Sequence, residues 1–112
     1  MNKKIEFEDN GEKYVLEYNR DSVAIMEGQG FAIEELTTRP MLMLPIAFKG
    51  LFYKNHKRVK QSFIDECYNR FSNKEQLITV IAEMLAETYD SLTDDNNETV
   101  SDKGNLDWKI VG

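Results

Sequence analysis

The sequence predicts an α+β fold in which an N-terminal β-hairpin packs on a small bundle of three to four helices. Residues 3–18 alternate charged and apolar side chains as strands do, and residues 59–92 carry apolar side chains at helical spacing. From residue 93 onward the chain is polar and acidic, without periodicity. We therefore expect one α+β domain over residues 1–92 and a flexible acidic C-terminal tail over residues 93–112.

The predicted hairpin has a clear turn. Ile5 and Phe7 alternate with glutamates, and the Asp-Asn-Gly run at residues 9–11 tolerates the positive φ angles of a two-residue turn. Along the returning strand, every second side chain points to the same face: Tyr14, Leu16 and Tyr18. An isolated hairpin is only marginally stable in water, so one of its faces should pack on helices.

A short helix should follow the hairpin. Residues 19–22 carry side chains that cap helix N-termini. Residues 23–27 then make one or two helical turns, and Gly28 or Gly30 ends them. Beyond this helix, residues 31–36 are expected to form a short extended piece.

The next helix is expected over about residues 40–55. Thr37 or Thr38 supplies its cap, and Pro40 fits the first turn because the N–H that proline lacks is unpaired there. The helix is apolar around its whole circumference: Met41, Leu42, Met43, Leu44, Ile46, Ala47, Phe48, Leu51 and Phe52. Such a helix is either buried in the middle of a domain or shared with another chain. We expect one face to lie in the core and a partner to cover the other.

The last two helices have the clearest periodicity. Residues 59–71 carry an apolar stripe: Phe63, Ile64, Cys67, Tyr68 and Phe71. Ser72 and Glu75 then have the spacing of a capping box, and a four-turn amphipathic helix follows over residues 75–92. Because the connection is short, these two helices should lie against each other as an αα-hairpin.

The residues capable of chemistry do not form a catalytic or metal site. His56 and Cys67 are the only histidine and cysteine, which is too few for a zinc site, and a thiol on an apolar stripe is inert. The acidic run at residues 94–98 lacks the alternating spacing of a calcium loop, and no Lys-Ser/Thr pair follows the glycines at 28–30. We therefore predict a protein that is not an enzyme and has no cofactor and no metal ion.

Charge and hydropathy narrow the range of partners. The net charge of −6 disfavours binding to nucleic acid or anionic lipid. No run of about eighteen apolar residues is present, so no helix is expected to span a membrane. An alternative to a protein-binding function is a small nucleic-acid-binding or regulatory protein. It would use the basic segment Lys49–Lys60, where aromatic side chains lie among the positive charges. The helix expected over residues 75–92 carries Glu83, Glu87 and Asp90 and would be repelled by phosphate, which favours a solvated positive turn instead.

Two segments are candidate partner-binding sites. In the helix over residues 40–55, five side chains are predicted to form an apolar groove for a helical client: Met41, Met43, Leu44, Phe48 and Phe52. The flexible, polarisable methionines suit a surface that accepts varied partners. The C-terminal LDWKIVG segment, residues 106–112, nearly alternates apolar and polar residues. We expect this segment to add a strand to a sheet or to dock on a partner through Trp108.

Several stretches together resemble a known family. They are the hairpin IEFEDNGEKYVLEYNR, the helix end MEGQGF and the proline-led helix PIAFKGLFYKNH, followed by a helix pair and an acidic tail. Over about residues 5–92, this pattern is similar to the small tail assembly chaperones of long-tailed, siphovirus-type phages and prophages of Gram-positive bacteria.

This resemblance implies a non-enzymatic role in phage tail assembly. Chaperones of this family bind the long, aggregation-prone tape measure protein, keep it soluble and help to recruit tail tube subunits. They are mainly helical, self-associate, act in the bacterial cytoplasm and are absent from the mature virion. A longer product of ribosomal frameshifting often accompanies the short form. The family establishes no site residues, so the candidate residues above rest on the side-chain pattern alone.

Overall fold

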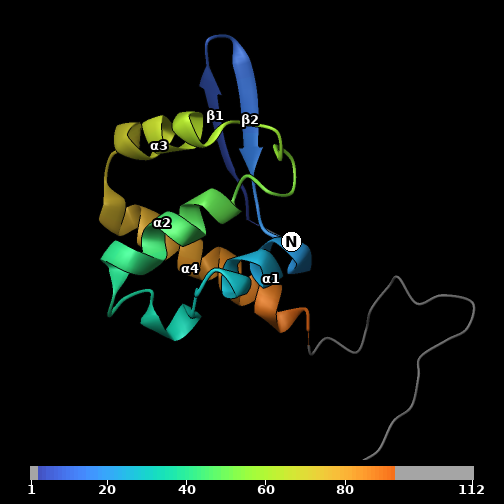
Figure 1. The fold of residues 1–112 in the computed structure, drawn as a ribbon, viewed down its shortest axis with the longest axis vertical. Helices are drawn as coiled ribbons and strands as arrows, with labels where there is room; N and C mark the ends of the chain where they lie inside the picture. Colours follow the sequence, from blue (N-terminus) through green and yellow to red (C-terminus); the bar gives the residue numbers. More distant parts are fainter. Residues whose placement is uncertain (1–2, 93–112) are drawn as a thin grey trace, which may run out of the picture.

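The computed structural model describes residues 3–92 and confirms the predicted α+β fold, a hairpin followed by four helices. In chain order the elements are β1 (Ile5–Asp9), β2 (Glu12–Leu16), α1 (Arg20–Gly28), the 3₁₀ turn η1 (Ile33–Glu35), α2 (Pro40–Gly50), α3 (Gln61–Arg70) and α4 (Lys74–Asp90) (Figure 1). The hairpin rises from one end of the helical layer. The predicted acidic tail and Trp108 lie outside the described residues.

The hairpin forms as its turn residues require. β1 and β2 pair antiparallel, with Ile5 opposite Leu16. The two turn residues, Asn10 and Gly11, have φ angles of 52° and 79°, the left-handed values that asparagine and glycine adopt most readily. The predicted turn is confirmed, and it fixes the register of the two strands.

The apolar face of the hairpin packs on α3. Tyr14 and Leu16 are buried, as the alternation predicts. The Phe7 ring stacks on Tyr14 with a centroid separation of 5.0 Å and meets Phe71 edge-on at 5.4 Å. Tyr14 also packs on Phe63 at 5.1 Å. Aromatic side chains at both ends of α3 therefore hold the hairpin on the helical layer.

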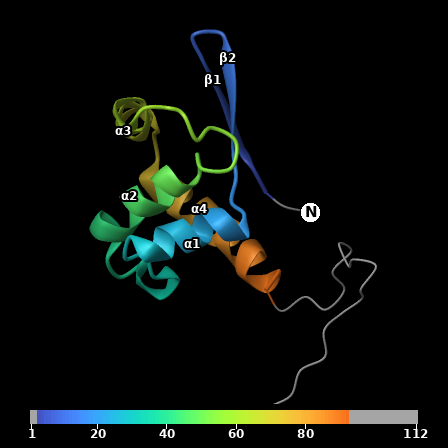
Figure 2. The ribbon, with the colours of Figure 1, turned by 45° about the vertical axis from the view of Figure 1, so that its right-hand side comes forward.

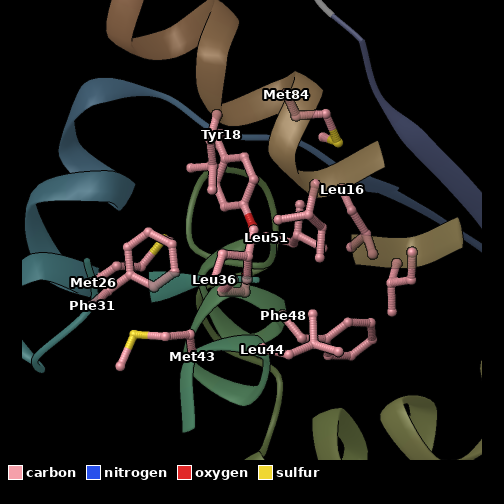
Figure 3. Packing of buried hydrophobic residues seen from close by; sticks show 14 of the residues in the cluster. Leu16, Tyr18, Met26, Phe31, Leu36, Met43, Leu44, Phe48, Leu51 and Met84 are labelled. Carbon is pink, nitrogen blue, oxygen red and sulfur yellow. The ribbon is translucent and has the colours of Figure 1, made fainter. Parts of the chain in front are cut away.

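The helix α2 lies at the centre of the helical layer. The backbones of α1 and α3 both approach it closely (Figure 2). Side chains from β2, α1, α2 and α4 meet in one hydrophobic cluster around it (Figure 3). The prediction that one face of this apolar helix lies in the core is confirmed, because Met43, Leu44, Ala47, Phe48 and Gly50 are buried.

The predicted αα-hairpin between α3 and α4 is wrong. The backbone of α3 approaches α2, whereas α3 and α4 do not pair along their lengths. At the connection, Phe71 has an extended backbone and Asn73 has a left-handed one with φ 56°. These two residues turn the chain, so α4 leaves α3 at an angle and passes behind α2 (Figures 1 and 2).

The capping chemistry is confirmed for α1. Asn19 Oδ1 accepts a hydrogen bond of 2.7 Å from the Ser22 N–H, and Ser22 Oγ accepts one of 2.9 Å from the Asn19 N–H. This reciprocal pair satisfies two N–H groups at the start of the helix. The helix ends at Gly28, where one of the two expected glycines stands.

Three other predicted boundaries need correction. The segment over 31–36 contains the 3₁₀ turn η1 and is not extended. The N-cap of α2 is Arg39, whose side chain makes no capping bond, instead of Thr37 or Thr38. The helix α2 also ends at Gly50 and continues as turns over 51–55, so it is shorter than expected.

The cap of α4 lies one residue later than predicted. Asn73 Oδ1 accepts a hydrogen bond of 3.1 Å from the Gln76 N–H, so Asn73, not Ser72, is the N-cap. The Ser72–Glu75 spacing matches a capping box in the sequence, but the left-handed backbone at position 73 moves the start of the helix. The amphipathic helix itself is confirmed, with Leu77, Ile81, Met84 and Leu85 buried.

Candidate interaction surfaces

The apolar groove predicted on α2 is absent from the surface of residues 3–92. Four of its five side chains are at most 5% exposed: Met43, Leu44, Phe48 and Phe52. They belong to the hydrophobic core, where Figure 3 shows Met43, Leu44 and Phe48. The reason is that α1, η1 and α3 lie against α2, and side chains of β2 and α4 belong to the same cluster. These side chains stabilise the fold and are not available to a partner.

The fifth predicted residue, Met41, is 87% exposed. Leu42 is 58% exposed beside it, and Pro45, one turn further on, is also exposed. We call Met41, Leu42 and Pro45 the exposed α2 face. Two other large apolar side chains stand out from the domain, Ile25 at 47% and Leu92 at 60%, on other elements. Within residues 3–92, the exposed α2 face is therefore the place where two large, exposed apolar side chains are neighbours on one helix.

The outer edge of β2 is closed by the turn that follows α2. The backbone N–H of Val15 donates a hydrogen bond of 3.1 Å to His56 Nε2, and Asn55 Nδ2 donates one of 3.1 Å to the Val15 carbonyl oxygen. Since His56 Nε2 accepts here, this nitrogen carries no proton. The imidazole also packs on the Tyr14 ring at 5.1 Å. His56 and Asn55 therefore have a structural role that sequence reasoning missed.

Glu17 is a buried carboxylate with two partners. Its side chain accepts a hydrogen bond of 2.9 Å from Asn55 Nδ2 and forms an ion pair of 3.1 Å with Lys54. The hydrogen bond from Asn55, together with Lys54, lowers the pKa of Glu17 below its ordinary value, although burial opposes the shift. A carboxylate held charged in this way is suited to fixing a turn, not to donating a proton.

The basic segment forms an open hollow of about 510 Å³, which we call the basic hollow. It is lined by Lys54, Asn55, His56, Lys57, Arg58 and Val59. Lys54 is engaged by Glu17. Lys57, Arg58 and Lys60 are exposed and form no ion pair with any other part of residues 3–92. As predicted, the positive charges follow the end of α2 as a turn.

The one cysteine is buried. Cys67 is 3% exposed on the inner face of α3, and burial raises the pKa of its thiol. A thiol with a raised pKa is a poor nucleophile and a poor metal ligand. Over residues 3–92, no three side chains of the types His, Cys, Asp and Glu lie close enough together to hold a metal ion.

Comparison with known proteins assigns a family to the chain. Residues 1–111 match the family described as domain of unknown function DUF5055. The chain belongs to this family. No curated protein and no solved structure matches it. The match spans nearly the whole sequence, so the DUF5055 domain includes the hairpin and all four helices described above.

In this DUF5055 chain, none of the helices within residues 3–92 has the length and apolarity that crossing a membrane requires. Two surface features of the described residues are candidates for binding a partner: the exposed α2 face and the basic hollow. Leu42 was not among the predicted partner-binding residues. A helix that is apolar all round gives no signal for which of its side chains stay outside.

Proposed function

We propose that this DUF5055 protein is a phage tail assembly chaperone, which binds the tape measure protein and keeps it soluble in the host cytoplasm without catalysing a reaction. The sequence resemblance over residues 5–92 supports the proposal. In this role the protein also helps to recruit tail tube subunits, self-associates and does not enter the mature virion. Its partners are other proteins, and it needs no cofactor.

The observation that carries the proposal is the exposed α2 face. Met41 is 87% and Leu42 58% exposed, on a helix whose other side is fixed in the core. Large apolar side chains at adjacent exposed positions are typical of protein-binding surfaces. A rigid helix loses little conformational entropy on binding, and methionine adapts its shape to different apolar surfaces. The exposed α2 face replaces the predicted groove as the place where the client docks.

The charge of the protein supports the same role. The net charge of −6 causes molecules that carry a bound client to repel one another. Near the exposed α2 face, Arg39 is neutralised by an ion pair of 3.3 Å with Glu35. A client therefore meets an apolar contact area in a domain that is acidic overall.

The proposal is tested by co-expression with a tape measure protein of a siphovirus-type phage of Gram-positive bacteria. We expect the wild type to co-purify with it and to reduce its aggregation, and Met41→Glu/Leu42→Glu to lose both effects. Ile25→Glu is the matched control, because Ile25 is also an exposed apolar residue on a helix. If neither the wild type nor the control binds the tape measure protein, the proposed function is wrong. If the double variant binds as well as the wild type, the exposed α2 face is not the site.

The basic hollow favours a second candidate function, binding of nucleic acid. Lys57, Arg58 and Lys60 are exposed without acidic partners in the described part of the chain, so they are free to contact phosphates. This function predicts binding that weakens steeply with salt and is lost in Lys57→Gln/Arg58→Gln/Lys60→Gln. Lys13→Gln is the control, since Lys13 is engaged by Glu6 at 3.3 Å. Absence of binding at low salt would exclude this candidate.

A further inference from the structure

The two edges of the hairpin differ. Glu6 lies directly opposite Val15 in the antiparallel pair. In such a pair, opposite residues either bond to each other or both point their N–H and C=O groups outward. Val15 points outward, because its N–H and C=O bond to His56 and Asn55. The N–H and C=O of Glu6 therefore point outward on the β1 side, and those of Glu8, two residues on, do the same.

The β1 edge of the hairpin is open, whereas the β2 edge is closed by His56 and Asn55. Within residues 3–92, no group outside the hairpin bonds to the backbone N–H of Glu6 or Glu8, and both side chains are exposed. An open strand edge is a template for a further strand, and proteins commonly cover such edges.

An apolar hollow lies next to this edge. It has a volume of about 180 Å³ and is lined by Ile5 of β1 together with residues at the end of α3 and the start of α4: Phe71, Ser72, Asn73, Gln76, Leu77 and Val80. A strand added beside β1 would point every second side chain to the face on which Ile5 and Phe7 lie. Those side chains would reach the hollow, so it provides a pocket beside a free edge.

We propose that the chain's own C-terminal segment, residues 106–111, occupies the β1 edge as a third strand and places apolar side chains in this hollow. The segment alternates in the required way: Leu106, Trp108 and Ile110 share one face, and Asp107, Lys109 and Val111 lie on the other. With the apolar face toward the hollow, Asp107 and Lys109 lie on the same face as the exposed carboxylates of Glu6 and Glu8. The opposite charges of Asp107 and Lys109 offset each other there, so the pairing depends on the apolar side chains in the hollow and on the backbone hydrogen bonds.

The segment can reach the edge. The Lys3 N–H donates a hydrogen bond of 2.8 Å to Glu87 Oε1, and the Lys3 ammonium pairs with Glu83 at 3.2 Å. The start of β1 therefore lies beside the second half of α4, close to where the described chain ends at Leu92. The residues between, 93–105, span up to about 43 Å when extended, at roughly 3.3 Å per residue. β1 itself is about 17 Å long, so the segment can pair from either end.

A second copy of the chain fits the edge less well. If the β1 strand of a second copy paired with this edge, the acidic residues Glu6, Glu8 and Asp9 of one molecule would lie next to the same residues of the other. Like charges on neighbouring strands oppose pairing. The tethered segment also has a high effective concentration at the edge, which a second molecule lacks. This inference goes beyond the proposed function, and its test requires no client.

Hydrogen exchange of the full-length protein tests the proposal. The Glu6 and Glu8 amides should exchange at least about tenfold more slowly than in full-length Trp108→Asp/Ile110→Asp, because only the wild type pairs them. The Val15 amide, bonded to His56, is the internal control and should not change. Equal exchange of Glu6 and Glu8 in the two proteins would overturn the proposal. Protection that is lost on dilution would also overturn it, because a second copy would then occupy the edge.

A second measurement uses Trp108, the only tryptophan in the chain. Its fluorescence should be blue-shifted in the wild type and should shift to the red in Glu8→Pro. Proline at this position removes an outward N–H and leaves the bonds to β2 intact. Circular dichroism checks that Glu8→Pro retains its helices, and Glu34→Lys, an exposed change on η1, should keep the blue-shifted emission. Identical emission in wild type and Glu8→Pro would overturn the proposal.

Discussion

The phenolic hydroxyl of Tyr18 donates a hydrogen bond of 2.6 Å to the backbone carbonyl oxygen of Ala47 in α2. This carbonyl is free to accept because the Leu51 N–H, which would bond to it in a longer helix, bonds to Phe48 O instead. Next to Tyr18, the Glu17 N–H donates to Leu51 O at 3.3 Å. The chain leaving β2 thus satisfies two carbonyl groups at the C-terminal end of α2, and joins the hairpin to the central helix.

Replacement of Tyr18 by phenylalanine should therefore destabilise the protein. Tyr18→Phe leaves the buried Ala47 carbonyl without a partner, which costs about 1–3 kcal/mol. The free energy of unfolding in urea measures the loss. Tyr53→Phe is the control: its hydroxyl contacts only the exposed Gln29 side chain at 3.1 Å, so we expect a change within about 0.5 kcal/mol. Equal losses in the two variants would contradict the capping role of Tyr18.

The carboxylate of Glu17 should make stability depend on pH in the acid range. Its pKa is lowered below the ordinary value of 4.5 in the folded protein, chiefly by the hydrogen bond from Asn55 and by Lys54. The charged form is thus favoured by folding, so its contribution is complete above pH 4.5 and is lost as the pH falls through the lower folded pKa.

Glu17→Gln should accordingly be less stable than the wild type near neutral pH, by about 1–2 kcal/mol, and should lose less stability on acidification. Urea unfolding at a series of pH values measures both effects. Glu34→Gln, at an exposed position, should follow the wild-type curve. A Glu17→Gln curve parallel to that of the wild type would show that Glu17 is not the titrating group.

Gly50 leaves room for a core side chain. A Cβ at this position would lie 2.3 Å from Met26 Sδ and 2.6 Å from its Cγ, and Met26 is fully buried. We expect Gly50→Ala to destabilise the protein by about 1–3 kcal/mol, even though alanine favours helices by about 1 kcal/mol. Thermal and urea unfolding measure this. In a Met26→Ala background the same change should cost little or be favourable, and a full cost there would exclude the clash as the cause.

Asn73 has two roles at the start of α4. Its side chain caps the helix through Gln76, and its backbone has a left-handed φ of 56°. Asn73→Ala loses both and should cost about 1–2 kcal/mol, whereas Asn73→Gly keeps the backbone conformation and should cost less. The order of stability, asparagine then glycine then alanine, is measured by unfolding. An alanine variant as stable as the glycine variant would contradict the role of the left-handed conformation.

Local chemistry made several elements predictable from the sequence. The turn at Asn10 and Gly11, the capping box of Asn19 with Ser22, and the periodicity of α4 each depend on residues that are neighbours in the chain. Side-chain alternation likewise predicted which face of β2 is buried. These features need only the conformational preferences of a few adjacent residues, so a single sequence carries them.

The tertiary structure alone decided which parts of the molecule are accessible. The sequence made α2 apolar all round, but only packing against its neighbours, among them α1 and α3, buried Phe48 and left Met41 and Leu42 outside. The closing of the β2 edge by His56 joins groups 41 positions apart, for which no local pattern exists. Burial of an apolar helix lowers the free energy in any orientation that covers it. The sequence therefore determined that this helix would be covered, and only the arrangement of its neighbours determined which side chains remained exposed.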